Sequence, residues 1–208
     1  MVQPFYRRAG GFTLVEALAV LAVSAILVAL ALPSFRGTVA RARAAETAAA
    51  LQASLELARA EAIRLNLPVT VCRSVDASLA MPGCSDASGG GYAGQDWAAG
   101  WVVFANTGGS EVGRIDDGDQ ILQRHAGLSN GRATRAFALS SAPMQFFVYS
   151  GDGLRDAGGP VAIAFSIDYR DPALSTASLA LRCVAVNVTG RASSHLPAAG
   201  GAAAAPAC

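Results

Sequence analysis

The sequence contains no lysine, and its charged residues are few. All 16 basic residues are arginine, and charged residues make up 15% of the 208 residues, against about 25% in typical soluble proteins. The formal net charge of +1 excludes a strongly basic or strongly acidic surface as a property of the whole chain. The glycine run 89–91 is no phosphate-binding loop, because no lysine follows it.

Histidine and closely spaced cysteines are scarce as well. The chain has two histidines, and its four cysteines include no C-x-x-C pair, so the spacing of a zinc site is missing. We expect disulfides, because the apolar opening segment would carry the chain out of the cytoplasm. Of the three possible pairings we favour Cys72 with Cys84 and Cys183 with Cys208, since each closes a short local loop. We expect no metal, no cofactor and no enzymatic activity.

Hydrophobic residues, in contrast, gather in one long run near the start. Arg7 and Arg8 precede the segment Phe12–Leu32, in which Glu16 is the only charged residue. As a helix this segment would rise about 30 Å, the thickness of the bilayer core. The two arginines favour a cytoplasmic N-terminus. The sequence therefore predicts one membrane span, with the rest of the chain on the opposite side.

The helical pattern continues beyond this run. Pro33 removes one helical hydrogen bond and bends a helix without ending it. Further on, apolar residues recur at steps of three and four, as on one helix face: Leu51, Leu55, Ala58, Ala62 and Leu65. We predict one long helix with an apolar half over 12–36 and an amphipathic half over 37–66.

Short runs of β-branched and aromatic residues follow, separated by turn sequences. They predict an antiparallel sheet over residues 67–190, with the amphipathic half of the helix covering one face, so that the fold class is α+β. Residues 191–208 suggest a weakly structured tail.

Three smaller features have simple structural interpretations. We expect one of Trp97 and Trp101 in the core and the other beside a loop. Residues 150–153 predict a hairpin turn. The acidic cluster 116–119 lacks the spacing of a calcium loop, so we interpret it as a polar turn.

Two ordinary interpretations of the first 35 residues leave Glu16 unexplained. A secretory signal cut after Ala31 would have an over-long apolar core containing a carboxylate. A plain membrane anchor accounts for the length but not for the charge, which costs about 2.5–3.5 kcal/mol at a bilayer centre and is usually functional.

The stretch GFTLVE, from Gly11 to Glu16, followed by an apolar run ending in ALPSF, resembles the class III signal of type IV pilins and pseudopilins. The resemblance implies a type IV pilin-like fold. It also implies that a prepilin peptidase removes the leader 1–11 by cutting between Gly11 and Phe12, and then N-methylates Phe12. Glu16 and Pro33 match positions that serve assembly in this family.

Cleavage would give Glu16 a partner. The new ammonium on Phe12 lies one helical turn before Glu16, so the two could pair within one chain. In a filament the ammonium could instead meet Glu16 of a neighbouring subunit, which in pilin families is thought to fix axial register. Both arrangements stay open.

Later segments, including ARAEAIRLNLPVTVCRS and DWAAGW, resemble the FimT/GspH branch of minor pilins and pseudopilins, and are closer to FimT-type pilus proteins. The resemblance implies a minor pilin of a type IV pilus, held in the inner membrane by a single span with a periplasmic C-terminal domain. Its implied partners are prepilin peptidase and other major and minor pilins. The alternative is a minor pseudopilin of a type II secretion system, with pseudopilins as partners.

DNA binding in a transformation pilus is a further alternative, because some FimT-type proteins bind DNA through a C-terminal Gly-Arg-x-Arg element. Here Gly190-Arg191-Ala192-Ser193 has only the first arginine. A small basic patch could still grip phosphates, although scattered solvated arginines are the simpler interpretation; its candidate residues are Arg132, Arg135, Arg182 and Arg191.

Overall fold

The computed structural model describes residues 11–74, 77–79, 82–84, 97, 100–108, 113–126, 134–138, 146–155, 163–169 and 180–196. The chain divides into two compact units, Met1–Val39 and Ala40–Cys208. The helix α1, Leu14–Leu65, begins in the first unit and ends in the second.

The end of α1 is set by the residue that follows it. Asn66 has a φ of 53°, a left-handed conformation that asparagine tolerates better than most residues. The N–H of Leu67 donates to the carbonyl of Ala62 at 3.3 Å and satisfies one of the last helical carbonyls. Pro68 comes next and cannot continue the helix. The chain therefore turns directly into the first strand.

The second unit contains two four-stranded sheets in which every pairing is antiparallel. The first sheet has the order β3 (Gln120–Ala126), β2 (Gly100–Ala105), β1 (Val69–Arg73), β5 (Phe146–Tyr149). The second has the order β4 (Thr134–Ala138), β6 (Ile163–Tyr169), β7 (Ala180–Val186), β8 (Ala192–His195). The predicted α+β class is confirmed, whereas the division into two sheets was not predicted.

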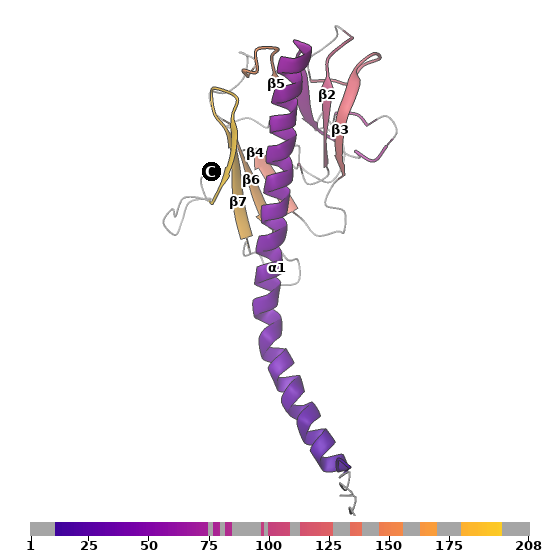
Figure 1. The fold of residues 1–208 in the computed structure, drawn as a ribbon, viewed down its shortest axis with the longest axis vertical. Coiled ribbons are helices and arrows are strands. Elements are labelled where there is room, and N and C mark those ends of the chain that lie inside the picture. The colour runs from indigo at the N-terminus through magenta and orange to yellow at the C-terminus, as the bar shows by residue number, and fades with distance from the viewer. Residues whose placement is uncertain are drawn as a thin grey trace, which may run out of the picture. The chain divides into compact units, whose positions relative to one another are not determined.

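The main core lies between α1 and both sheets. On α1 the buried apolar residues are 0–1% exposed and comprise Ala44, Ala48, Leu51, Leu55, Ala58 and Ala62. They share one cluster with residues of both sheets, among them Val71, Phe147, Phe165 and Val184. In Figure 1 the later part of α1 lies over the strands of both sheets. The predicted apolar face is confirmed, with Leu65 partly buried at its end.

Both tryptophans belong to this core. Trp97 is fully buried and packs edge-on against Phe165, with ring centroids 5.1 Å apart. Trp101 is 2% exposed, and its indole N–H donates to the Ser54 hydroxyl of α1 at 2.9 Å. The prediction that one tryptophan only flanks a loop was wrong, because helix and sheets together enclose both rings.

The C-terminal strand β8 corrects the prediction of a weakly structured tail from Arg191. Its sequence ASSH lacks the apolar alternation of a strand, but it pairs with β7 from Val186 to Cys183. The N–H of Ala192 also donates to Glu56 Oε1 of α1 at 3.0 Å. Pairing with β7 and the contact with Glu56 of α1 therefore stabilise this strand. Residues 197–208 lie outside the described part of the chain.

Three hydrogen bonds join the end of α1, the turn after β5 and the turn before β8. Besides the Glu56 contact, Arg59 Nε donates to the Gly153 carbonyl at 3.0 Å, and the Tyr149 hydroxyl donates to the Gly190 carbonyl at 2.9 Å. Gly153 and Gly190 have φ values of 74° and 77°, a left-handed conformation that glycine adopts without steric cost. The predicted turn at 150–153 is confirmed, with Gly153 N donating to the Ser150 carbonyl.

Candidate functional site: the start of the long helix

The first described residues, Gly11–Thr13, lie outside any helix. Thr13 precedes the first residue of α1 and acts as its N-cap: its hydroxyl oxygen accepts from Glu16 N at 3.3 Å, and its carbonyl accepts from Ala17 N at 3.1 Å. Two N–H groups at the helix start are thereby satisfied. The cap at Thr13 was not predicted, although the pattern Thr-x-x-Glu is that of a capping box.

The bond between Gly11 and Phe12 is uncrowded. A Cβ added to Gly11 would meet no atom within 4 Å, and the Phe12 side chain is 85% exposed. Arg7 and Arg8, which favour a cytoplasmic N-terminus, lie outside the described residues. Nothing in the described part of the chain obstructs access to this bond.

Glu16 occupies the first turn of α1. A carboxylate there is favoured by the partial positive charge at a helix N-terminus. Its side chain is exposed, as are its described neighbours. The Glu16 carboxylate is therefore both compatible with the helix start and available to a further positive partner.

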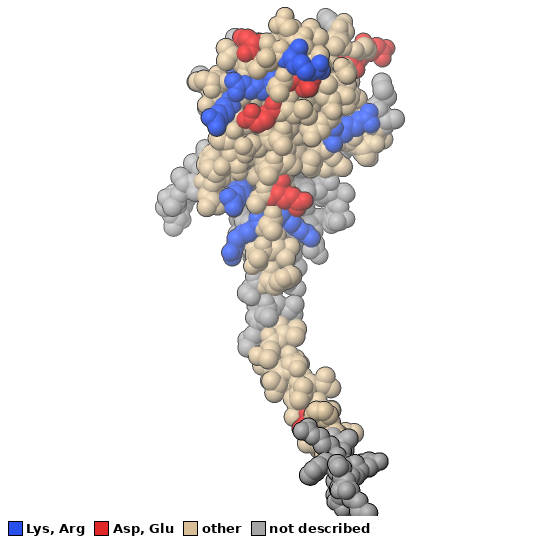
Figure 2. Space-filling model, viewed as in Figure 1, with Lys and Arg blue, Asp and Glu red and all other residues tan. Residues whose placement is uncertain are grey.

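The segment behind Glu16 exposes its apolar side chains. The exposed fraction of the large apolar side chains from Phe12 to Val28 ranges from 56% at Leu18 to 85% at Phe12. Figure 2 shows almost no charge along the described part of this segment. An exposed apolar surface of this length is typical of segments that lipid or another protein covers.

Pro33 lies within α1, which continues past it to Leu65. Its side chain is outside the described residues.

Within the described residues, no helical stretch combines the length and the apolar character needed to span a bilayer.

The sequence matches two family profiles. Residues 6–32 match the prokaryotic N-terminal methylation motif, and residues 47–190 match the family described as type II transport protein GspH. The second match covers more than half of the 208 residues. This chain belongs to the GspH family. It is a minor pilin or pseudopilin, as the resemblance predicted.

Two crystal forms of the type IV minor pilin FimU from Pseudomonas aeruginosa are among the similar solved structures. The first is 18% identical and covers 73% of this chain and 87% of FimU, with a TM-score of 0.47. The second is 16% identical and covers 72% of this chain and 90% of FimU, with a TM-score of 0.46. No curated protein matches the sequence.

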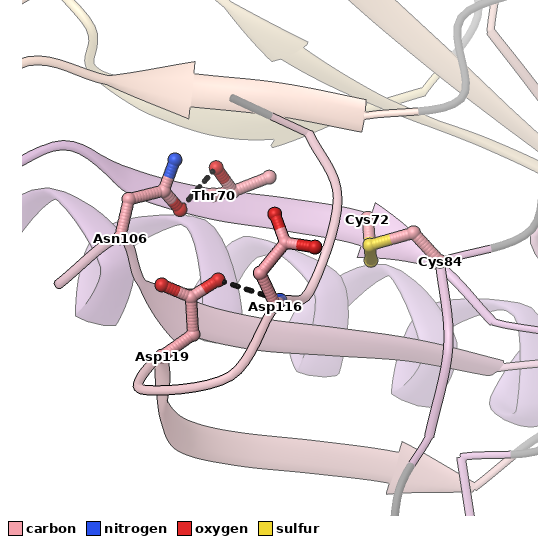
Figure 3. Close-up of a disulfide and its surroundings, with 6 residues drawn as sticks. All are labelled: Thr70, Cys72, Cys84, Asn106, Asp116 and Asp119. Atoms are coloured by element: carbon pink, nitrogen blue, oxygen red, sulfur yellow. Dashed lines mark hydrogen bonds between the residues drawn. A yellow bond between two sulfur atoms is a disulfide. The ribbon is translucent and has the colours of Figure 1, made fainter. Parts of the chain in front are cut away.

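In this GspH-family domain, the predicted disulfide between Cys72 and Cys84 is present, with 5.5 Å between the Cα atoms (Figure 3). Cys72 is fully buried in a second apolar cluster on the face of the first sheet away from α1, together with Val102, Phe104 and Ile115. The disulfide therefore fixes the segment after β1 against this face. Cys183 is buried in β7, and its predicted partner Cys208 lies outside the described residues, so that pairing stays a prediction.

The acidic turn next to this cluster is a structural feature. The Asp119 carboxylate accepts from the N–H groups of Thr107, Gly108 and Asp116 at 3.0–3.3 Å, and Thr107 donates its hydroxyl to the Gly118 carbonyl. Figure 3 shows the Asp119 contact with Asp116. Among the described residues, no group of three His, Cys, Asp or Glu could hold a metal. The hydrogen bonds of Asp119 and Thr107 confirm the interpretation as a polar turn.

The four arginines suggested for DNA binding are not brought together by the described strands. Arg132 lies outside the described residues, and the β4 register sets Arg135 opposite Asp168. Arg182 is near the start of β7, whereas Arg191 is exposed beyond the end of β7. The strand length between these two backbone positions argues against a compact patch, and DNA binding stays a prediction.

One short motif was overlooked in the sequence. Residues 127–131, GLSNG, match the letters G-x-S-x-G of a hydrolase nucleophile turn. That motif requires a strand before it and a helix after it, whereas here it lies between strands β3 and β4. The residues themselves are outside the described part, and the flanking elements give this match no support.

Proposed function

We propose that this protein is a minor subunit of a type IV pilus. It is made as an inner-membrane precursor with the N-terminus in the cytoplasm, and its domain after the helix lies in the periplasm. Prepilin peptidase cuts between Gly11 and Phe12 and methylates Phe12. The mature subunit then joins the filament with other pilins.

The observation that carries this proposal is the combination of two features. The methylation motif at residues 6–32 includes the start of a long helix, whose described apolar side chains are exposed up to Val28. The later part of the same helix is buried in its own β-domain. A plain membrane anchor would also expose such an apolar segment, but it would give no role to Glu16, the one charged residue between Phe12 and Leu32.

The resemblance of ARAEAIRLNLPVTVCRS to FimT-type proteins supports a pilus over a secretion system. The description of the matched family, type II transport protein GspH, supports the second candidate, a minor pseudopilin.

Deleting the gene in its own host separates these candidates. We expect loss of surface pili and twitching, with secretion of type II substrates unchanged. Loss of secretion with normal pili would establish the pseudopilin role instead. A plasmid copy of the wild-type gene restores whichever phenotype belongs to the protein.

A further inference from the structure

The helix start determines the backbone conformation at the bond proposed for cleavage. Because Thr13 caps α1, the helix begins at Leu14 and leaves Gly11 and Phe12 outside it. The two hydrogen bonds to Thr13, from Glu16 N and Ala17 N, hold this boundary. The Gly11 carbonyl thus takes no part in the helix.

If the helix began at Gly11, the Gly11 carbonyl would become part of the helical hydrogen-bond pattern. With Gly11 as the N-cap, its carbonyl oxygen would accept the first helical hydrogen bond, from the N–H of Val15. The scissile carbonyl would then be tied into the helix and less open to a nucleophile. Extended, exposed backbone is what proteases cut most readily.

The sequence around Thr13 makes an upstream shift the expected response to its loss. Gly11 ranks close to threonine as an N-cap residue. Downstream, the stretch 14–23 contains no Ser, Thr, Asp, Asn or Gly, so no comparable cap is available before Ser24. Without the Thr13 hydroxyl, a helix that starts at Gly11 therefore has the most favourable N-cap residue available.

We propose that Thr13 is a positioning residue for the processing reaction: by capping α1 it keeps the Gly11–Phe12 bond outside the helix and accessible to the peptidase. This inference rests on the proposed function, because it assumes cleavage at that bond. Glu16 supports the same boundary, since a carboxylate in the first turn is favoured at a helix that starts there.

The test uses the full-length chain in membrane vesicles with purified prepilin peptidase, and measures the initial rate of leader removal. Thr13→Val keeps the shape of threonine but has no side-chain oxygen to accept from Glu16 N, and Thr13→Ala lacks this oxygen as well. Thr13→Ser and Thr13→Asn change the shape but keep an acceptor. We expect Val and Ala to slow cleavage about fivefold, the population change that loss of a typical N-cap causes, and Ser and Asn to cleave at nearly the wild-type rate.

A spectroscopic measurement accompanies the rates. In detergent micelles, ¹³Cα shifts of Gly11 and Phe12 should move toward helical values in the Val and Ala variants, and stay unchanged in the Ser and Asn variants. Normal cleavage of Thr13→Val with slow cleavage of Thr13→Asn would mean that the peptidase reads side-chain shape, and would overturn the inference. Equal rates for all variants would also overturn it while leaving the proposed function intact. Failure of the wild-type chain to be cut after Gly11 would overturn both.

Discussion

At the residue scale, a few polar side chains are held by specific partners inside the domain. His125 of β3 stacks on Trp101, with ring centroids 3.8 Å apart and planes 5° from parallel. Trp101 in turn donates to Ser54 of α1. The stack therefore links the edge of the first sheet to the helix.

The environment of His125 leads to a pH dependence. Burial lowers the pKa of His125, while a backbone hydrogen bond at Ala126 and the charge of Glu46 act against this shift. The unfolded chain binds a proton near pH 6.5, whereas the folded chain binds it only at lower pH. The free energy of unfolding should therefore fall as the pH drops below about 6.5.

Replacing the ring tests this. His125→Phe keeps a flat ring against Trp101 but cannot titrate, so its urea midpoint should change less between pH 7 and pH 5 than that of the wild type. The measurement is tryptophan fluorescence of the full chain in detergent. Identical pH profiles for the two proteins would show that His125 does not carry the effect.

At the element scale, the described residues that α1 buries lie on one face of its later part, and a pair of leucines makes this measurable. Leu55 is fully buried in the core, whereas Leu57 is partly exposed on another side of the helix. Leu55→Ala should lower the free energy of unfolding by about 2–5 kcal/mol, because it removes buried methyl groups and leaves a cavity. Leu57→Ala is the matched control and should cost clearly less; equal losses would contradict the burial of this face.

The strand β8 depends on its contact with α1. Glu56→Ala removes the acceptor of the Ala192 N–H and should lower local protection by about 1–3 kcal/mol, seen as faster amide hydrogen exchange over residues 192–195. Glu56→Gln keeps an acceptor oxygen and should retain most of the protection. Unchanged exchange in the alanine variant would mean that pairing with β7 alone orders the strand.

These elements also show what could be predicted from sequence. The buried face of α1 was predictable, because the steps of three and four at Leu51, Leu55 and Ala58 follow from helix geometry. The order of strands in two sheets was not, because antiparallel pairing between distant segments leaves no periodic signal. β8 was missed because its stability comes from Glu56 and β7 rather than from its own polar residues. Thr13 was missed although its capping pattern was present.

At the scale of the whole molecule, the chain joins a self-contained domain to a segment that needs partners. The second unit, Ala40–Cys208, has its own core, whereas the described apolar side chains of the first unit are exposed as far as Val28. Glu16 is the one charged residue between Phe12 and Leu32. In our account its carboxylate meets the ammonium that cleavage creates on Phe12.

The role of the Glu16 charge can be tested separately from the role of its side chain at the helix start. Glu16→Gln keeps a side chain suited to a capping box, but removes the charge. We expect Glu16→Gln to be cleaved normally and yet to be strongly depleted from sheared pili, because a neutral side chain cannot attract the new ammonium. Normal incorporation of Glu16→Gln would contradict the role of the charge.

We expect this chain to be processed and assembled as a pilin. Mass spectrometry of the protein recovered from sheared surface filaments tests it most directly. We expect an N-terminal peptide that begins at Phe12 and carries one methyl group on its amine. A mature chain that begins at Met1, or one cut after Ala31 as a secretory signal would be, would contradict it.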